Sequence, residues 1–234
     1  MLAIYKREMR AYFTTPIGYV FAAIFLSLSA AVFCYTTLYM LSADVSSYFT
    51  IMLFALVVLL PLLTMKTLSE ERKTKTEQLL LSSPVSLTGM VMAKFLAAAT
   101  VFFACVLVTS LNFIILYTHA EPNTAVILGS ILALLLVGMA FLAVGLFVSS
   151  LTESQLAASV ITVAILLVLM VISLAGSLFS APWLRFILSG LSVFSRFQNF
   201  TNGIFDVAAL VYYLSLTGVF LFLTVRVYDH RRYA

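Results

Sequence analysis

Residues 124–148 read TAVILGSILALLLVGMAFLAVGLFV and contain no charged side chain. A helix of about 20 residues crosses the hydrocarbon core of a bilayer, which is about 30 Å thick, so this run is long enough to span it. The composition of the chain agrees, because 63% of its 234 residues are hydrophobic and 9% are charged, against about 45–50% and about 25% in soluble domains. We therefore expect lipid to surround most of the chain.

Five other stretches between charged residues are long enough to cross a membrane in the same way. A charge at mid-bilayer costs about 3 kcal/mol on insertion scales, which places residues such as Lys94, Glu121 and Glu153 in the connections. We predict an all-α integral membrane protein in which residues 1–234 form a single transmembrane domain of six helices. The predicted spans are 17–41, 47–65, 95–118, 124–148, 155–180 and 207–225.

The distribution of basic residues predicts the orientation of these spans. Of the 13 Lys and Arg residues, all except Arg185 and Arg196 fall in the amino-terminal flank, in the connection after the second span or in the carboxy-terminal tail. Short loops rich in Lys and Arg stay on the cytoplasmic side of a membrane, so we expect both termini to be cytoplasmic. The basic net charge is thereby explained by topology, and we expect no nucleic-acid partner.

The amino-terminal residues 1–15 have the pattern of an amphipathic helix that lies along the inner headgroups and ends before Pro16. A frayed basic flank that only enforces orientation is the alternative. The two faces of the predicted interfacial helix carry Leu2, Tyr5, Met9 and Tyr12 on one side, and Lys6, Arg7 and Arg10 on the other.

The predicted cytoplasmic loop, residues 66–94, reads KTLSEERKTKTEQLLLSSPVSLTGMVMAK and concentrates charge in a chain that otherwise avoids it. Thr74 and Glu77 have the spacing of a capping box, and Pro84 ends the short helix that follows. Three leucines on this helix would expose apolar area unless something covers them. Two covers for these leucines are consistent with the sequence: a partner protein, or the inner ends of the chain's own helices.

Residues 181–206, APWLRFILSGLSVFSRFQNFTNGIFD, are too apolar for a solvated loop and too interrupted by proline and glycine to span a membrane. We predict one or two short external helices that re-enter the bilayer or lie on its outer interface, where Trp183 and the phenylalanines fit an aromatic belt. Asp206 stands at the start of the last span, where a carboxylate meets the positive end of the helix dipole.

The sequence lacks the chemistry of several other membrane proteins. The six predicted spans contain no Asp, Glu, His or Arg, the residues that carry coupling charge in ion-driven transporters. No glycine is followed by lysine, as a phosphate-binding GxxxxGK[ST] loop requires. We identify no catalytic residue, no metal ligands and no cofactor site, so the energy for vectorial work must come from another chain.

Two stripes of small residues and one proline stand out inside the spans. Small side chains allow two helix backbones to approach closely, either within one subunit or against a second copy. Pro61 is predicted to kink the second span one turn before the cytoplasmic loop and to serve as a hinge. The stripes are Ser27, Ala30, Ala31 and Cys34 in the first span, and Gly138, Gly145 and Ser149 in the fourth.

Several stretches together resemble the membrane subunits of type-2 ABC exporters, in the branch of the gliding-motility and nitrous-oxide-reductase-maturation permeases. YKREMRAYFTTPIGYVF resembles the amino-terminal interfacial helix of that family, and SEERKTKTEQLLLSSPVS resembles its cytoplasmic signature. RFQNFTNGIFDVAALVYYLSLTGVFLFLTVRVYDHRR resembles the last external helix and sixth span of the branch. Lys75 departs from the pattern, because the family usually has glycine there, which affects the turn before the coupling helix.

The resemblance implies a six-helix permease in the bacterial cytoplasmic membrane that pairs with a second copy of itself or a related permease. It favours a separate cytoplasmic ABC ATPase, which binds ATP and Mg²⁺, as the partner that docks on the loop, and it makes the external segment a gate. The implied ATPase-coupling residues are Glu70, Glu71, Arg72, Thr76, Glu77, Leu79, Leu80 and Pro84. The implied gate residues are Trp183, Phe197, Phe200 and Asp206.

Two functions of different classes follow from these observations. The first is the permease half of an ATP-driven exporter that moves substrate through a subunit interface. The alternative is a membrane anchor or mechanical transmitter of an ATPase-driven envelope assembly that carries no cargo itself. An enzyme within the membrane is a third possibility, for which His119 and His230 would be required, although the predicted topology places them on opposite sides.

Overall fold

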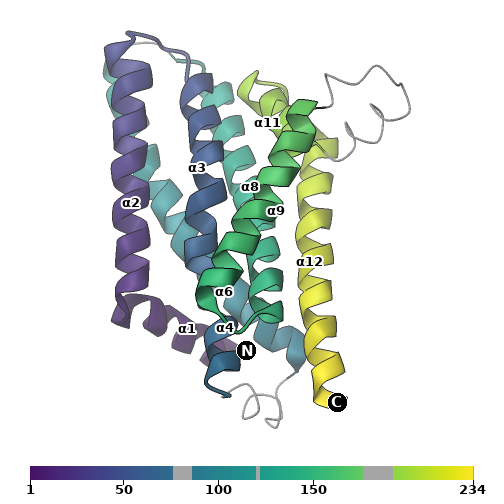
Figure 1. Cartoon of the computed structure of the whole chain (residues 1–234). Coiled ribbons are helices and arrows are strands. Elements are labelled where there is room, and N and C mark those ends of the chain that lie inside the picture. The colour runs from purple at the N-terminus through teal and green to yellow at the C-terminus, as the bar shows by residue number, and fades with distance from the viewer. Residues whose placement is uncertain (76–85, 120–121, 176–191, 234) are drawn as a thin grey trace, which may run out of the picture.

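A bundle of long apolar helices makes up most of the molecule (Figure 1). The computed structural model describes residues 1–75, 86–119, 122–175 and 192–233, and the regular elements in this part of the chain are all helices. Six of them are long and apolar enough to cross a membrane, which confirms the predicted all-α class. The six spans begin with α2 (Pro16–Phe33), α3 (Ser46–Thr64), α6 (Leu87–Ser110), α8 (Thr124–Leu151), α9 (Gln155–Ala175) and α12 (Val207–Tyr233). The π-helical segment η1 (Cys34–Tyr39) continues α2, and α7 (Asn112–His119) continues α6.

Helix α8 is the centre of the bundle and packs against α3, α6, α9 and α12. In its most apolar stretch 72% of the residues are buried, the highest share among the six spans. Its glycines allow this packing, because a Cβ atom at Gly138 would overlap the ring of Phe102 on α6 and one at Gly145 would overlap the hydroxyl of Thr64 on α3. The small-residue stripe of the fourth span therefore serves internal packing.

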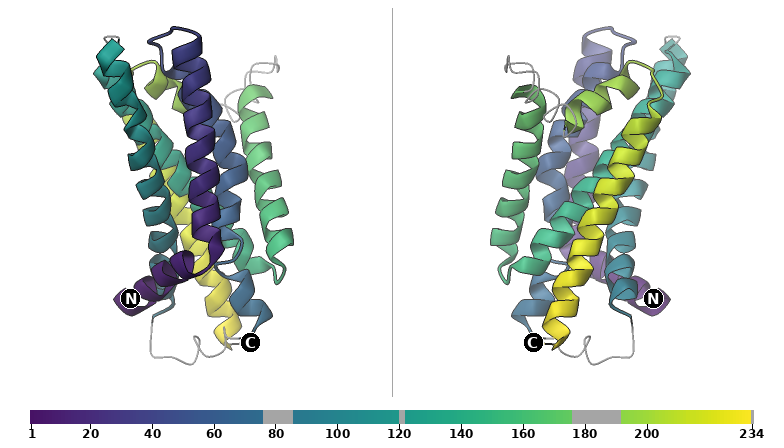
Figure 2. Two further views of the ribbon diagram at one scale, coloured as in Figure 1. Left: turned by 90° about the vertical axis from the view of Figure 1, so that its left-hand side faces the viewer. Right: turned by 90° about the vertical axis from the view of Figure 1, so that its right-hand side faces the viewer.

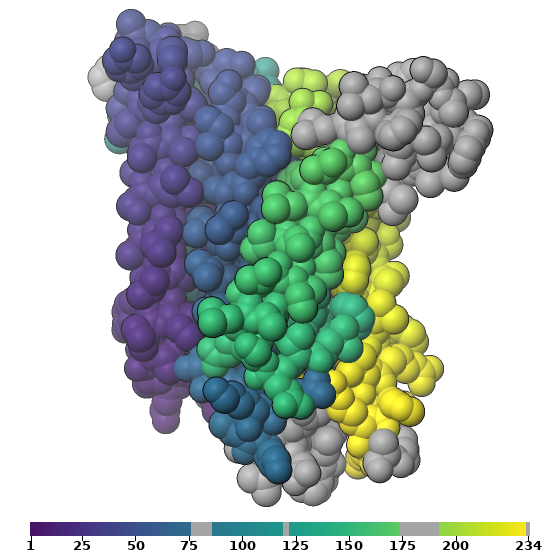
Figure 3. Space-filling model, viewed as in Figure 1, coloured from purple at the N-terminus to yellow at the C-terminus, as the bar shows by residue number. Residues whose placement is uncertain are grey.

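The stripe on α2 behaves differently from the one on α8. Its members, Ser27, Ala30, Ala31 and Cys34, are all exposed. The core-facing side of α2 carries large aromatic residues instead, and the ring of Phe25 meets that of Phe102 edge-on with 6.1 Å between centroids. Figure 3 shows α2, α3 and α9 forming one face of the molecule. The small residues of α2 are thus available for contact outside the chain.

Short helices lie at both ends of the bundle in the part of the chain that the structure describes (Figures 1 and 2). Helices α1 (Leu2–Thr14) and α4 (Ser69–Lys73) lie at the end where both termini lie, together with the start of α6 and the last turns of α12. We call this the charged end. Helix α11 (Val193–Thr201), which carries Arg196, lies at the opposite end. The predicted segregation of basic residues is thus present in the fold, and which end faces the cytoplasm stays a prediction.

The structure corrects the predicted boundary of the cytoplasmic loop. Helix α6 begins at Leu87, well before residue 95, so the second part of the predicted loop 66–94 is helical. Ser86 caps this earlier start, because its hydroxyl accepts a hydrogen bond from the Gly89 amide at 3.3 Å. We expected Lys94 to lie in the loop just before the third span, but it lies within α6 and is fully buried. Its charge does not end the helix because it is paired there.

Candidate coupling site at the charged end

Helix α4 is fixed at its start by a side chain of the central helix. The first amides of a helix have no partner within it, and here the amides of Leu68 and Ser69 both donate to Oγ of Ser149 on α8, at 3.2 and 3.1 Å. The Ser149 hydroxyl in turn donates to the carbonyl oxygen of Met65 at 3.3 Å. The turn that connects α3 to α4 is thereby attached to α8.

An ionic cluster joins α4 to α1 and α6. Lys94 Nζ lies 2.8 Å from Glu71 Oε1 on α4 and 3.2 Å from Glu8 Oε1 on α1. Arg7 Nη2 lies 2.7 Å from the same oxygen atom of each carboxylate. Two cations and two carboxylates thus form a network of balanced charge, which we call the four-charge cluster: Arg7, Glu8, Glu71 and Lys94.

Burial makes this cluster different from an ordinary surface ion pair. Lysine is almost never fully buried unless it is paired, and Lys94 satisfies a further donor by giving a 3.0 Å hydrogen bond to the carbonyl oxygen of Thr67. Burial by itself lowers the pKa of Arg7, but the hydrogen bonds and charges of Glu8 and Glu71 outweigh it and raise that pKa above its ordinary value. The two carboxylates therefore favour the charged form of the Arg7 guanidinium.

Tyr12 adds a neutral contact beside the cluster. Its hydroxyl donates to the carbonyl oxygen of Leu63 near the end of α3, at 3.1 Å. Burial raises the pKa of Tyr12 to about 12, so the phenol stays protonated and remains a donor. The amphipathic helix predicted for the amino terminus is present as α1, and its Tyr5, Met9 and Tyr12 face the bundle. Its location along lipid headgroups stays a prediction.

The other side of α4 is attached to the connection between α8 and α9. Arg72 Nε lies 3.1 Å from Glu153 Oε1, and Arg72 Nη1 donates to the carbonyl oxygen of Leu151 at 2.5 Å. Lys66 and Glu70 form a further pair at 3.3 Å. Exposed pairs of this kind contribute about 0–1 kcal/mol each, so the Arg72 contacts orient α4 more than they stabilise the fold.

The structure brings together part of the predicted coupling set. Glu71 and Arg72 contact distant parts of their own chain, whereas Glu70, 41% exposed, pairs only with the nearby Lys66 among the described residues. Thr74 follows α4, and its hydroxyl donates to the Glu70 carbonyl oxygen at 2.9 Å. The capping box that we predict between Thr74 and Glu77 extends into residues outside the described part of the chain. Lys75 has φ of 57°, the left-handed conformation that glycine adopts readily. Thr76, Glu77, Leu79, Leu80 and Pro84 lie outside the described residues, and their roles stay predictions.

Pro61 lies in the last turn of α3 and is buried. Proline has no amide hydrogen to donate to the residue four positions earlier, but its own carbonyl oxygen accepts from the Met65 amide at 2.8 Å. Helix α3 ends at Thr64, about one turn after Pro61. The turn that follows is the one that Ser149 attaches to α8. Its action as a hinge stays a prediction.

Of the predicted external segment, α11 packs against α8, α9 and α3 at the end opposite the charged end. Helix α11 turns Phe197 and Phe200 inward, where both are buried. It is attached by Tyr213 of α12, whose hydroxyl donates to the Val193 carbonyl oxygen at 2.7 Å, and by Ser46 of α3, which donates to the Thr201 carbonyl oxygen at 3.3 Å. Trp183 lies outside the described residues.

Asp206 caps the last span as predicted. Its Oδ1 accepts from the amides of Ala208 and Ala209 at 2.9 and 3.3 Å, and its Oδ2 accepts from Asn199 Nδ2 at 2.9 Å. The hydrogen bond from Asn199, together with the two amides, lowers the pKa of Asp206 below its ordinary value. A charged carboxylate therefore links α11 to the start of α12.

Two members of the site, Glu8 and Ser149, are not predicted from the sequence. Glu8 was not singled out, although it is the one acidic residue among residues 1–15, and that isolation within a basic segment was the available signal. Ser149 was assigned only to close packing, and nothing in its sequence context indicates that it accepts from the start of α4. Within the described ranges, no group of three His, Cys, Asp or Glu side chains is placed to hold a metal ion.

The fold and this site define a multi-pass, all-helical membrane protein. At its charged end the short helix α4 is attached to α1, α6 and α8. A sequence profile described as ABC-2 family transporter protein matches residues 41–226. The chain therefore belongs to the ABC-2 family of transporter proteins. A comparison with curated proteins finds no match. The membership supports a permease subunit of an ABC transporter, which is not itself catalytic.

Proposed function

We propose that this chain is the permease subunit of an ATP-driven exporter in a bacterial cytoplasmic membrane, with the charged end toward the cytoplasm. The sequence resemblance described above favours the gliding-motility and nitrous-oxide-reductase-maturation branch. A separate ABC ATPase, which binds ATP and Mg²⁺, docks on the loop that contains α4. The observation that carries this proposal is the double attachment of α4, through Glu71 to α1 and α6 and through Arg72 to the α8–α9 connection.

The double attachment supports a mechanical route from the ATPase to the bundle. A force on the loop displaces α4, and the Glu71–Lys94 pair passes that displacement to α6 because breaking a buried pair would leave an uncompensated charge. The exposed Arg72 contacts keep α4 oriented toward the α8–α9 connection. Pro61 lies between α4 and the body of α3 and allows the end of α3 to bend. At the other end, α11 with Phe197, Phe200 and Asp206 opens as an external gate.

The same mechanism requires a second permease copy. The exposed stripe of Ser27, Ala30, Ala31 and Cys34 offers a surface for close helix contact. In the proposal two copies meet along this face, and substrate moves between them when the two ATPase subunits close on ATP.

The test measures ATP hydrolysis by the proposed partner ABC ATPase, co-expressed with this chain and reconstituted in proteoliposomes. Glu77→Arg is expected to abolish co-purification of the ATPase, because it reverses a charge on the docking loop. Glu71→Gln is expected to keep co-purification and to lower the permease-dependent stimulation of hydrolysis about fivefold or more, since it breaks the link between loop and bundle. Asp44→Asn is the control, because it removes one carboxylate at the opposite end.

Each outcome has a clear meaning. Loss of docking in Glu77→Arg with normal behaviour of Asp44→Asn supports the loop as the docking site. An ATPase that neither binds the wild-type chain nor responds to Glu77→Arg overturns the proposal. Stimulated hydrolysis without movement of any cargo, in a preparation that retains an envelope partner, would instead support the anchor or transmitter.

A further inference from the structure

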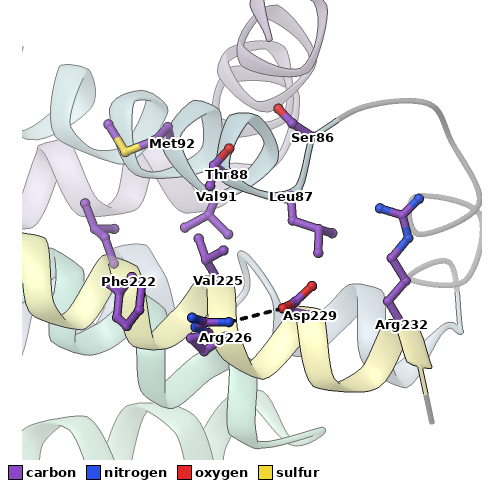
Figure 4. A pocket seen from close by; sticks show the side chains of 11 residues that line it. Ser86, Leu87, Thr88, Val91, Met92, Phe222, Val225, Arg226, Asp229 and Arg232 are labelled. Atoms are coloured by element: carbon purple, nitrogen blue, oxygen red, sulfur yellow. Dashed lines mark hydrogen bonds and ion pairs between the residues drawn. The ribbon is translucent and has the colours of Figure 1, made fainter.

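A groove runs between α6 and α12 at the charged end, apart from the four-charge cluster (Figure 4). Its volume is about 510 Å³, within the range of about 300–1,000 Å³ typical of small-molecule sites. Helix α6 contributes Leu87, Val91 and Met92, and α12 contributes the facing wall. The groove is open along its length, so a ligand can enter from the side.

The walls of the groove change from apolar to charged along the helix axes. Figure 4 shows Phe222 and Met92 at one end, Val91 and Val225 in the middle, and Arg232 at the other end. The apolar part belongs to the spans, and the charged part lies where α12 reaches the charged end of the bundle. A ligand that follows this gradient is amphiphilic, with its polar group at the level of the arginines.

The charges of the groove favour an anion. Arg226 and Arg232 line it together with a single carboxylate, Asp229. Arg226 Nη1 lies 3.5 Å from Asp229 Oδ2, and its side chain is 65% exposed. Arg232 is exposed and forms no ion pair or hydrogen bond with any residue in the described part of the chain. One positive charge is therefore left over, carried by a guanidinium, whose planar set of donors suits a phosphate.

We propose that this groove binds an anionic glycerophospholipid from the leaflet at the charged end. The phosphate lies between Arg226 and Arg232, and an acyl chain lies along Val91, Leu221 and Phe222. Binding to the folded state stabilises it, so the lipid holds α12 against α6. This site does not depend on the proposed exporter function, because it requires neither an ATPase nor a substrate.

The test uses native mass spectrometry of the full-length chain in detergent, titrated with phosphatidylglycerol or with phosphatidylcholine. We expect the wild-type chain to retain one phosphatidylglycerol and to bind it about tenfold more tightly than phosphatidylcholine. Both lipids offer a phosphate for charge-assisted hydrogen bonds, but the ammonium group of phosphatidylcholine is repelled by the arginines. Arg226→Gln with Arg232→Gln should lower the phosphatidylglycerol affinity about tenfold. Both side chains are exposed, so the fold is expected to persist, as circular dichroism can verify.

Two further variants separate the groove from general surface charge. Lys6→Gln with Arg10→Gln also removes two positive charges at the charged end, but these lie outside the groove. This double variant should change the phosphatidylglycerol affinity less than about twofold. Val225→Trp fills the apolar part without changing charge and should expel both lipids. Equal losses in the two charge variants, or full retention of phosphatidylglycerol by Arg226→Gln with Arg232→Gln or by Val225→Trp, would overturn the site.

Discussion

At the scale of single residues, Lys94 determines the chemistry of the charged end. It is a fully buried cation in a span that we expected to be free of charge, and it is stable there because Glu8 and Glu71 face it. Such a group contributes specificity more than net stability, because the cost of removing charges from water offsets most of their attraction. The cluster therefore determines which way α4 and α1 dock on α6.

Lys94→Met tests this assignment. Removing one partner of a buried pair is expected to lower the free energy of unfolding by about 3–5 kcal/mol, because Glu8 and Glu71 are left with Arg7 alone. Adding Glu71→Gln should recover part of that loss, so the two changes should be non-additive. Denaturant unfolding in detergent measures both effects, with Lys73→Met, an exposed lysine on α4, expected within about 0.5 kcal/mol of wild type. Strict additivity would contradict the cluster.

At the scale of elements, the position of α4 depends on how closely α8 approaches α3. Gly145 allows this approach, because any side chain there would overlap Thr64. Ser149, one turn further along α8, then reaches the amides at the start of α4. One face of α8 thus both packs against α3 and positions α4.

Gly145→Val should separate α8 from α3 and lower the stability by about 1–3 kcal/mol, the usual cost of overpacking. The matched control is Gly218→Val on α12, where a Cβ atom would meet nothing within 4 Å. Thermal unfolding of both variants in detergent measures the difference. If Gly218→Val proved as destabilising as Gly145→Val, the effect would come from helix propensity and not from the α8–α3 contact.

At the scale of the whole molecule, several spans are mostly uncovered by the other helices, and in the most apolar stretch of α12 28% of the residues are buried. Only 33% of the most apolar stretch of the first span is buried, and only 22% of that of α9. Figure 3 shows both helices on the same face. An apolar face of this kind lies against lipid or against another subunit, and the small residues of α2 favour a subunit.

Cys34, which is exposed on that stripe, reports on the pairing of two copies. Oxidative crosslinking in membranes is expected to give a dimer through Cys34, whereas the buried Cys105 does not react. Cys34→Ser should abolish the dimer, and Cys34→Ser with Val211→Cys should not restore it, because Val211 is exposed on a different helix, α12. A dimer formed equally well through Val211→Cys would show random collision instead of a defined interface.

The sequence by itself determined the six spans, the amphipathic α1, the gathering of basic residues at one end and the cap at Asp206. Each of these depends on properties that act locally, because hydropathy, charge and capping chemistry operate within a few residues of the chain. They require no knowledge of which helices meet.

Only the tertiary structure decided that Lys94 is buried within α6, that Glu8 and Ser149 contact the surroundings of α4, and that the stripe on α8 packs internally while the stripe on α2 faces outward. These outcomes depend on which helix faces meet. Burial of an unpaired lysine is unfavourable, but it becomes stable when two carboxylates distant in the sequence pair with it. A stripe of small residues has the same sequence pattern whether or not a neighbouring helix covers it.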